Sequence, residues 1–188
     1  LRPGKTDYIM RSNDRPDLKL AVRPIQSTIR SYDDLNFLIP VDANETNPPP
    51  RFVVFCDSRT ETEQAAMHLR DRLPARLKDR VKYYHAVMSN EYRETEAKGF
   101  MDDGGSWGLI VTDAFGMGVD MTGIAIVVQW RARCDASTLI QRFGRGARGS
   151  GEVAWAVLLA EKKYFDDERA KASQRRQRRR QQDQRRKE

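Results

Sequence analysis

Short apolar runs alternate with amphipathic stretches along most of the chain. The runs are nearly continuous and rich in β-branched and aromatic residues, which indicates strands buried on both faces. We expect six strands, at Leu18–Ile25, Arg51–Cys56, Val81–Ala86, Leu109–Ala114, Ile124–Trp130 and Val153–Ala160. The intervening segments predict helices, at Ser27–Leu38, Glu61–Leu73, Glu91–Met101 and Ala136–Phe143. This alternation predicts an α/β fold, with a parallel sheet sandwiched by helices.

Composition narrows the class of protein. The 188 residues are 39% hydrophobic and 32% charged, which suits one domain with a sizeable core. No apolar run approaches the roughly 20 residues that a membrane span needs. Cys56 and Cys134 have no partner at metal-ligand or redox spacing. The sequence therefore argues against a membrane protein, a disulfide scaffold and a cysteine-based zinc site. The proline-rich segment Asn44–Pro50 predicts a surface loop within the domain.

The net charge of +7 is concentrated at one end of the chain. Residues 168–188 hold ten Lys or Arg and three acids, whereas the other residues hold 24 of each sign. This tail has no aromatic or β-branched residue, so we expect a solvated helix or a disordered segment. We divide the chain into a leading linker (1–11), a folded domain (12–167) and the tail. Nucleic-acid binding, nuclear import and a charged extension without a partner are all open for its arginines, among them Arg175, Arg176, Arg178, Arg179 and Arg180.

Two motifs follow predicted strands. In LIVTDAFGMGVDM (109–121), a strand ends at Thr112 and Asp113, a turn with Gly116 and Gly118 follows, and Asp120 comes next. Ligands of parallel sheets gather at the carboxyl ends of strands, where Asp120 could accept a hydrogen bond from a ribose hydroxyl. A tight turn without a ligand explains the glycines equally well. The tripeptide at residues 4–6 (GKT) lacks the strand and helix of a phosphate loop, so no self-sufficient nucleotide site is predicted.

The second motif, QRFGRGARG (141–149), places Arg142, Arg145 and Arg148 three residues apart. These arginines have few acids nearby in the sequence. Since a guanidinium group matches phosphate geometry, the spacing favours a phosphate clamp for a nucleotide held elsewhere, with a solvated basic face as the alternative.

Taken in order, these motifs resemble those of a known family. RFVVFCDSR (51–59), Tyr84-His85-Ala86, VTDAFGMGVDM and QRFGRGAR look like motifs IV, V and VI of superfamily 2 helicases, in particular the second RecA-like domain of RecQ-type DNA helicases. The resemblance covers about residues 12–160. Arg142 departs from it, because RecQ-type proteins usually have Glu there and an Arg is more typical of other superfamily 2 branches. Ala147 replaces a usual Gly, and the arginine-rich tail stands where a zinc-binding region normally follows.

The resemblance implies a RecA-like fold and a shared ATP site. ATP would lie between this domain and an upstream RecA-like domain, which supplies the phosphate loop and the Mg²⁺ ligands. Arg145 and Arg148 would face the γ-phosphate, with Arg148 as the arginine finger. Three residues would line the ATP or interdomain surface: Gln141, Gly118 and Asp120. Single-stranded or forked DNA would cross the sheet edge at four residues: Ser58, Arg59, His85 and Thr112.

The resemblance thus predicts half of an ATP-dependent DNA helicase moving 3′ to 5′, inactive as an ATPase by itself. An RNA helicase or duplex translocase, or a catalytically degenerate nucleic-acid-binding module, are the alternatives. We expect no metal site in this chain and no membrane partner, and a nuclear location in a eukaryote or a cytoplasmic one otherwise.

Overall fold

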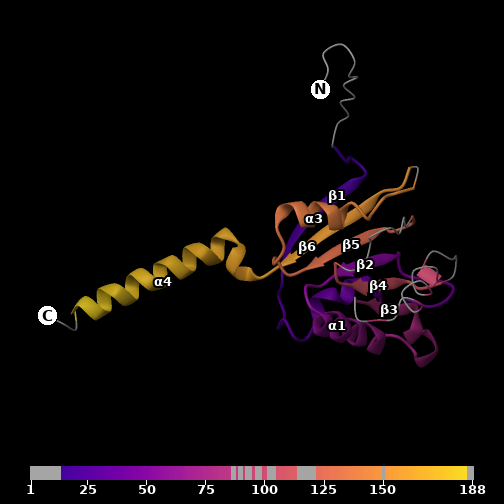
Figure 1. Ribbon diagram of the computed structural model, residues 1–188. Coiled ribbons are helices and arrows are strands. Elements are labelled where there is room, and N and C mark those ends of the chain that lie inside the picture. The colour runs from indigo at the N-terminus through magenta and orange to yellow at the C-terminus, as the bar shows by residue number, and fades with distance from the viewer. Residues whose placement is uncertain are drawn as a thin grey trace, which may run out of the picture.

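The computed structural model describes residues 14–85, 105–113, 122–149 and 151–185, with single positions 88, 91, 95, 99 and 100, and the side chains of the last helix through Gln177. Six parallel strands of this part form one sheet, in the spatial order β1-β6-β5-β2-β4-β3 (Figure 1). They are β1 (Leu18–Pro24), β2 (Phe52–Phe55), β3 (Val81–Tyr84), β4 (Gly108–Val111), β5 (Ile126–Trp130) and β6 (Ala154–Ala160). All six predicted strands are confirmed.

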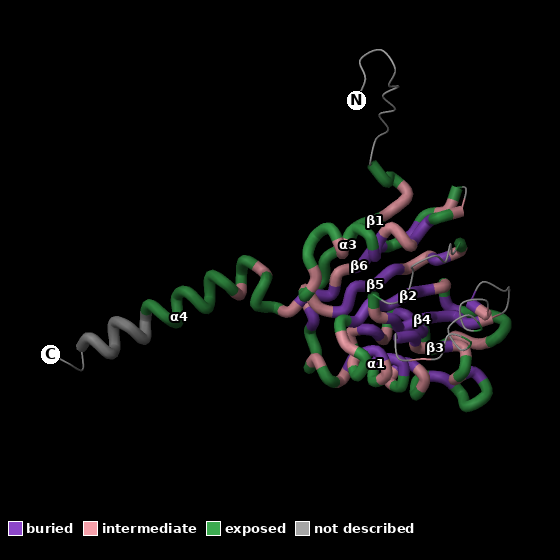
Figure 2. Tube along the Cα trace, viewed as in Figure 1, coloured by how far each residue is buried: buried purple, intermediate pink, exposed green. Residues whose placement is uncertain are grey.

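The central strands of the sheet are buried between two hydrophobic clusters, as the purple strands of Figure 2 show. Side chains alternate along β2, so that Phe52 and Val54 join one cluster while Val53 and Phe55 join the other. α1 (Arg59–Asp71), η1 (Asp33–Leu38) and η2 (Ala75–Arg80) contribute to the first cluster, and α3 (Ala136–Phe143) contributes to the second. The predicted sandwich of a parallel sheet between helices is therefore confirmed.

The helices match their predictions to different degrees. α3 has the predicted bounds, whereas α1 begins two residues early, because the Ser58 side chain accepts a hydrogen bond from the Glu61 amide and caps the helix. The helix predicted at Glu91–Met101 lies mostly outside the described residues. No described helix is long and apolar enough to cross a membrane.

The predicted helix at Ser27–Leu38 is wrong over its first half. Only the 3-10 helix η1 forms, and it begins at Asp33. The Asp34 carboxylate accepts hydrogen bonds from the backbone amides of Gln26 and Ser27, at 2.8 and 2.9 Å. These bonds turn the chain back on itself, and such side-chain to backbone bonds compete with a regular helix.

After β6 the chain runs through η3 (Lys162–Tyr164) into α4 (Asp166–Arg185). Figure 1 shows α4 projecting away from the sheet. The described part of the tail, through Arg185, is helical, which is one of the two states predicted for it.

Candidate nucleotide and nucleic-acid interface

The carboxyl ends of the strands bring the four residues predicted for the nucleic-acid track, Ser58, Arg59, His85 and Thr112, to one edge of the sheet. Asp57 and Ser58 follow β2, Thr112 and Asp113 follow β4, and His85 follows β3. Because the strands are parallel and adjacent, these ends meet on the side where α1 begins. The N-terminus of α1 adds the positive end of a helix dipole, which favours an anion. Ser58 is half-buried and Arg59 exposed at this point.

Arg142 corrects the predicted clamp of three arginines. Its side chain is only 5% exposed, and it donates to Asp113 at 2.7 Å and to Asp57 at 3.0 Å. It also donates to the Gln129 side chain and lies over the Phe55 ring. The acids that pair with Arg142 come from the ends of other strands. The lack of acids close to Arg142 in the sequence therefore did not mean that its charge is unpaired. Arg142 is a buried link between three strands and is not available to a phosphate.

The pKa of Arg142 reflects this environment. Burial alone would lower it, but the hydrogen bonds to Asp113 and Asp57 outweigh burial and raise the pKa above its ordinary value. The guanidinium group therefore stays charged, and its charge is balanced within the fold.

Arg145 and Arg148 lie in a loop that follows α3. Arg145 is half-buried and Arg148 is exposed, with the Arg148 Nε donating to the Gly144 carbonyl at 2.9 Å. Between them Gly146 is packed so closely that an added Cβ would lie 2.8 Å from the Ala154 Cβ. Ala147 has φ of 52°, in the left-handed region that favours glycine. This explains physically why a glycine is usual at that position of the motif.

Two side chains hold this arginine loop, one of them distant in the sequence, and both escaped the sequence analysis. Arg15 donates to the carbonyl oxygens of Gly146 and Ala147, both at 3.1 Å, and is itself held by the Asp17 carboxylate at 2.7 Å. At the other end of the loop, the Glu152 carboxylate accepts from the Gly149 amide at 2.9 Å and from the Gly123 amide at 3.1 Å.

A second charged cluster at the same edge was also missed. Arg131, at φ of 70°, contacts Glu61 at 2.9 Å and Glu161 at 3.0 Å, so that it joins the ends of β5 and β6 to the start of α1. Its partners lie 70 and 30 residues away in the sequence, where no local spacing could have revealed them. Among the described residues, no group of three or more His, Cys, Asp or Glu side chains could hold a metal ion.

The remaining predicted residues differ in their surroundings. His85 is buried, with its Nε2 atom 3.0 Å from the Glu63 carboxylate, and Thr112 is half-buried. Gln141 is exposed on α3. Arg175 and Arg176 are exposed on α4. Gly118 and Asp120 lie outside the described residues, as do the side chains of Arg178, Arg179 and Arg180.

Comparison with known proteins places the chain in a family of helicase domains. Residues 31–150 match the family model of the helicase conserved C-terminal domain. The ATP-dependent RNA helicase eIF4A of Lodderomyces elongisporus is 29% identical over 116 residues, which cover 62% of this chain and 28% of that protein. DEAD-box ATP-dependent RNA helicase 50 of Arabidopsis thaliana is 30% identical over 110 residues, which cover 56% and 14%. The chain thus spans less than a third of the length of these relatives.

Solved structures share the fold. The E. coli DEAD-box protein SrmB, in a complex with regulator of ribonuclease activity A, superimposes with a TM-score of 0.60 at 22% identity, covering 76% of each chain. Mycobacterium smegmatis helicase Lhr, bound to single-stranded DNA and AMP-PNP, gives 0.58 at 20% identity, covering 77% of this chain and 19% of that one. These likenesses confirm the RecA-like fold.

Proposed function

Since the chain belongs to the family of helicase conserved C-terminal domains, we propose that it is the second RecA-like half of an ATP-dependent RNA helicase. The observation that carries the choice of RNA is the set of curated relatives, which are named RNA helicases. Arg142 agrees with it, because an arginine there is more typical of superfamily 2 branches other than RecQ. The RecQ-type DNA helicase expected from the sequence is not supported by these relatives, and the RNA helicase given as its alternative fits them better.

In this proposal the arginine loop faces ATP held by an upstream domain. Arg145 and Arg148 follow α3 and are accessible to different degrees, whereas the nearby Arg142 is fully engaged inside the fold. Arg148, the more exposed of the two, is the residue that we assign to the γ-phosphate. The upstream domain would supply the phosphate loop and the ligands of Mg²⁺. Gln141, with the motif residues Gly118 and Asp120, would line the interdomain surface. An arginine finger stabilises the charge that develops in the transition state.

The RNA backbone would cross the carboxyl edge of the sheet. Ser58 and Arg59 stand at the N-terminus of α1, whose amides favour a phosphate, and Thr112 lies on the neighbouring strand end. His85 belongs to the same edge, although its Nε2 atom contacts Glu63. Contacts of this kind hold the backbone and do not distinguish bases. The track would therefore bind RNA of any sequence.

The test is ATP hydrolysis by the full-length parent protein with single-stranded RNA, with DNA of the same sequence, or with neither. We expect stimulation by RNA. Arg148→Ala should lower kcat by about 10³- to 10⁵-fold, with the KM for ATP changed much less. Arg76→Ala is the matched control, because this exposed arginine lies on η2, near the opposite ends of the strands.

Three results would contradict the proposal. Stimulation by DNA alone would restore the DNA helicase. No turnover with either nucleic acid would favour a binding module without catalysis. Hydrolysis by the 188-residue chain alone would show that the ATP site does not need an upstream domain.

A further inference from the structure

We propose that α4 is a second nucleic-acid site, an arm that binds the phosphate backbone of RNA outside the track on the sheet edge. The inference rests on the proposed function for the identity of the polyanion. The observations that carry it are the position of α4, the exposure of its side chains and the distribution of its charge.

α4 begins at the edge that carries the track. β6 ends at Ala160, on the same side as the ends of β2 and β4, and only η3 separates it from the first residue of α4. At 1.5 Å per residue, the 20 residues of α4 extend about 30 Å from this edge. RNA leaving the track therefore passes within reach of the arm.

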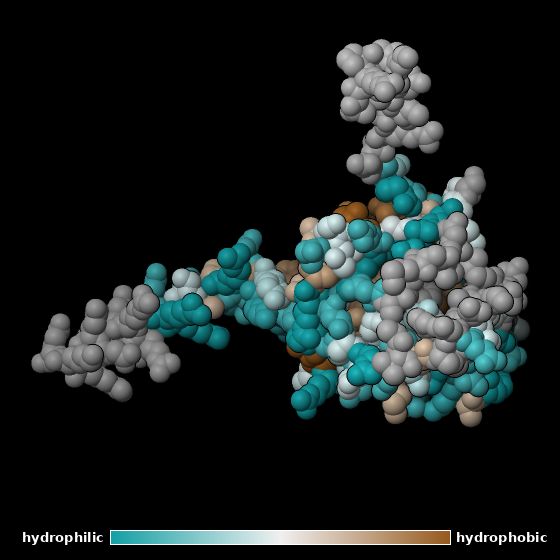
Figure 3. Space-filling model, viewed as in Figure 1, coloured by the Kyte–Doolittle hydropathy of each residue, from teal (hydrophilic) through white to brown (hydrophobic). Residues whose placement is uncertain are grey.

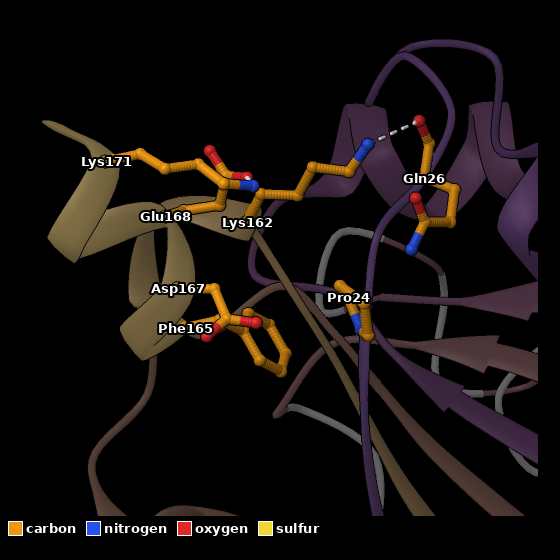
Figure 4. Close-up of a pocket in the computed structure, with 7 residues that line it drawn as sticks. All are labelled: Pro24, Gln26, Lys162, Phe165, Asp167, Glu168 and Lys171. Atoms are coloured by element: carbon orange, nitrogen blue, oxygen red, sulfur yellow. Dashed lines mark hydrogen bonds and ion pairs between the residues drawn. The ribbon is translucent and has the colours of Figure 1, made fainter.

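The structure shows the arm joined to the rest of the fold at its root. A hollow of about 280 Å³ separates the first turn of α4 from the end of β1, with Pro24 and Gln26 on one side and Phe165 and Glu168 on the other (Figure 4). Lys162 crosses it to the Gln26 carbonyl at 3.3 Å. Beyond this point every described side chain from Arg169 to Gln177 is exposed, and the described surface of α4 is mainly hydrophilic (Figure 3).

The charge of α4 is not balanced within the described part of the chain. The first turn pairs its own acids, with Lys171 2.8 Å from Glu168 and Arg169 3.8 Å from Asp166. Arg175 and Arg176 form no ion pair with any described residue. The sequence then places Arg179 and Arg180 three and four residues after Arg176. Like charges at this spacing destabilise a helix, and phosphate groups between them would remove the penalty.

The composition of the arm selects among possible partners. It has no aromatic residue on which a base could stack, so single-stranded RNA would gain no stacking there. It has no apolar face for a protein groove or a membrane surface. What remains is attraction to phosphate, which is independent of sequence.

The experiment measures RNA binding by the 188-residue chain by fluorescence anisotropy over a range of salt concentrations. One variant replaces Arg175, Arg176, Arg178, Arg179 and Arg180 with Gln, and a matched variant replaces the same five with Lys. Arg, Lys and Gln have similar helix propensities, which circular dichroism would check. Because each phosphate contact contributes roughly 0.7 to 0.9 to the slope of log K against log salt, the Gln variant should lose about 3.5 to 4.5 of that slope. The Lys variant should keep it.

Each outcome decides a separate point. An unchanged slope in the Gln variant would overturn the arm while leaving the RNA helicase proposal intact. If α4 binds RNA but the parent protein shows no RNA-stimulated hydrolysis, the RNA helicase proposal would be overturned and the arm would stand. A loss in the Lys variant equal to that in the Gln variant would contradict recognition by charge alone, as would different affinities for two unrelated RNA sequences. Binding to phosphatidylserine vesicles but not to RNA would also overturn the inference.

Discussion

Replacing Arg142 with alanine tests the buried ion-pair network most directly. The substitution leaves the Asp57 carboxylate, 19% exposed, and the fully buried Gln129 amide oxygen without their donor. Each such group costs about 1–3 kcal/mol when unpaired. Asp113 is 66% exposed and would be hydrated instead. We therefore expect the free energy of unfolding to fall by about 3–5 kcal/mol, the range found when one partner of a buried pair is removed.

Urea denaturation of the 188-residue chain would measure this loss. With a typical urea dependence of about 2 kcal/mol/M, the midpoint should fall by about 2 M. Asp113→Asn is the control for the exposed end of the network and should cost less than about 1 kcal/mol. Arg142→Lys should lie between the two, because an ammonium group cannot reach all three partners in the geometry of a guanidinium group. A loss below about 1 kcal/mol for Arg142→Ala would refute the reasoning, as would an equal loss for Asp113→Asn.

Three further changes give separate tests of stability, each read by urea denaturation. Gly146→Ala should cost about 1–3 kcal/mol, because the new Cβ would collide with Ala154; an unchanged midpoint would contradict the packing. Ala147→Gly should gain about 0.5–1 kcal/mol, since relief of the left-handed strain exceeds the entropy of glycine; a loss would show that the strain is absent. Burial alone would raise the pKa of Glu161, but hydrogen bonds from its own amide, the Ala132 amide and Arg131 lower the pKa below the ordinary value of 4.5. The stabilisation by the ionised Glu161 carboxylate is therefore present above pH 4.5 and is lost as the pH falls further. As the pH falls, the free energy of unfolding of Glu161→Gln should then decline less than that of the native chain. Parallel declines would exclude this contribution of Glu161.

The sequence predicted the central strands well because β2, β4 and β5 are buried on both faces. Residues such as Val53 and Val54 pack into opposite clusters, so the whole run must be apolar and is visible without knowledge of its partners. α3 was equally clear from its apolar spacing. Ser27–Leu38 was misassigned because the carboxylate of Asp34 binds amides several residues earlier, and propensity does not register such bonds.

The sequence indicated which residues lie together at the sheet edge, but it did not reveal the ion pairs of Arg142. Ser58 and Thr112 follow apolar strands, so a parallel sheet had to bring them to one edge. The partners of Arg142, by contrast, lie 85 and 29 residues away from it. A usable signal did exist, because Asp57 and Asp113 each lie two residues beyond the end of a buried strand of the same sheet. An arginine approaching that edge on a helix meets two carboxylates there.

The hydrogen bonds from Arg15 to the arginine loop have a mechanical consequence. Asp17 holds Arg15 on one side and accepts a backbone bond from Ala154 on the other, so the segment before β1 is fixed both to the loop and to the sheet. A pull on this segment that displaced Arg15 would release the carbonyl groups of Gly146 and Ala147 together. Tension on the segment before β1 would therefore loosen the backbone between Arg145 and Arg148, about 130 residues later in the sequence.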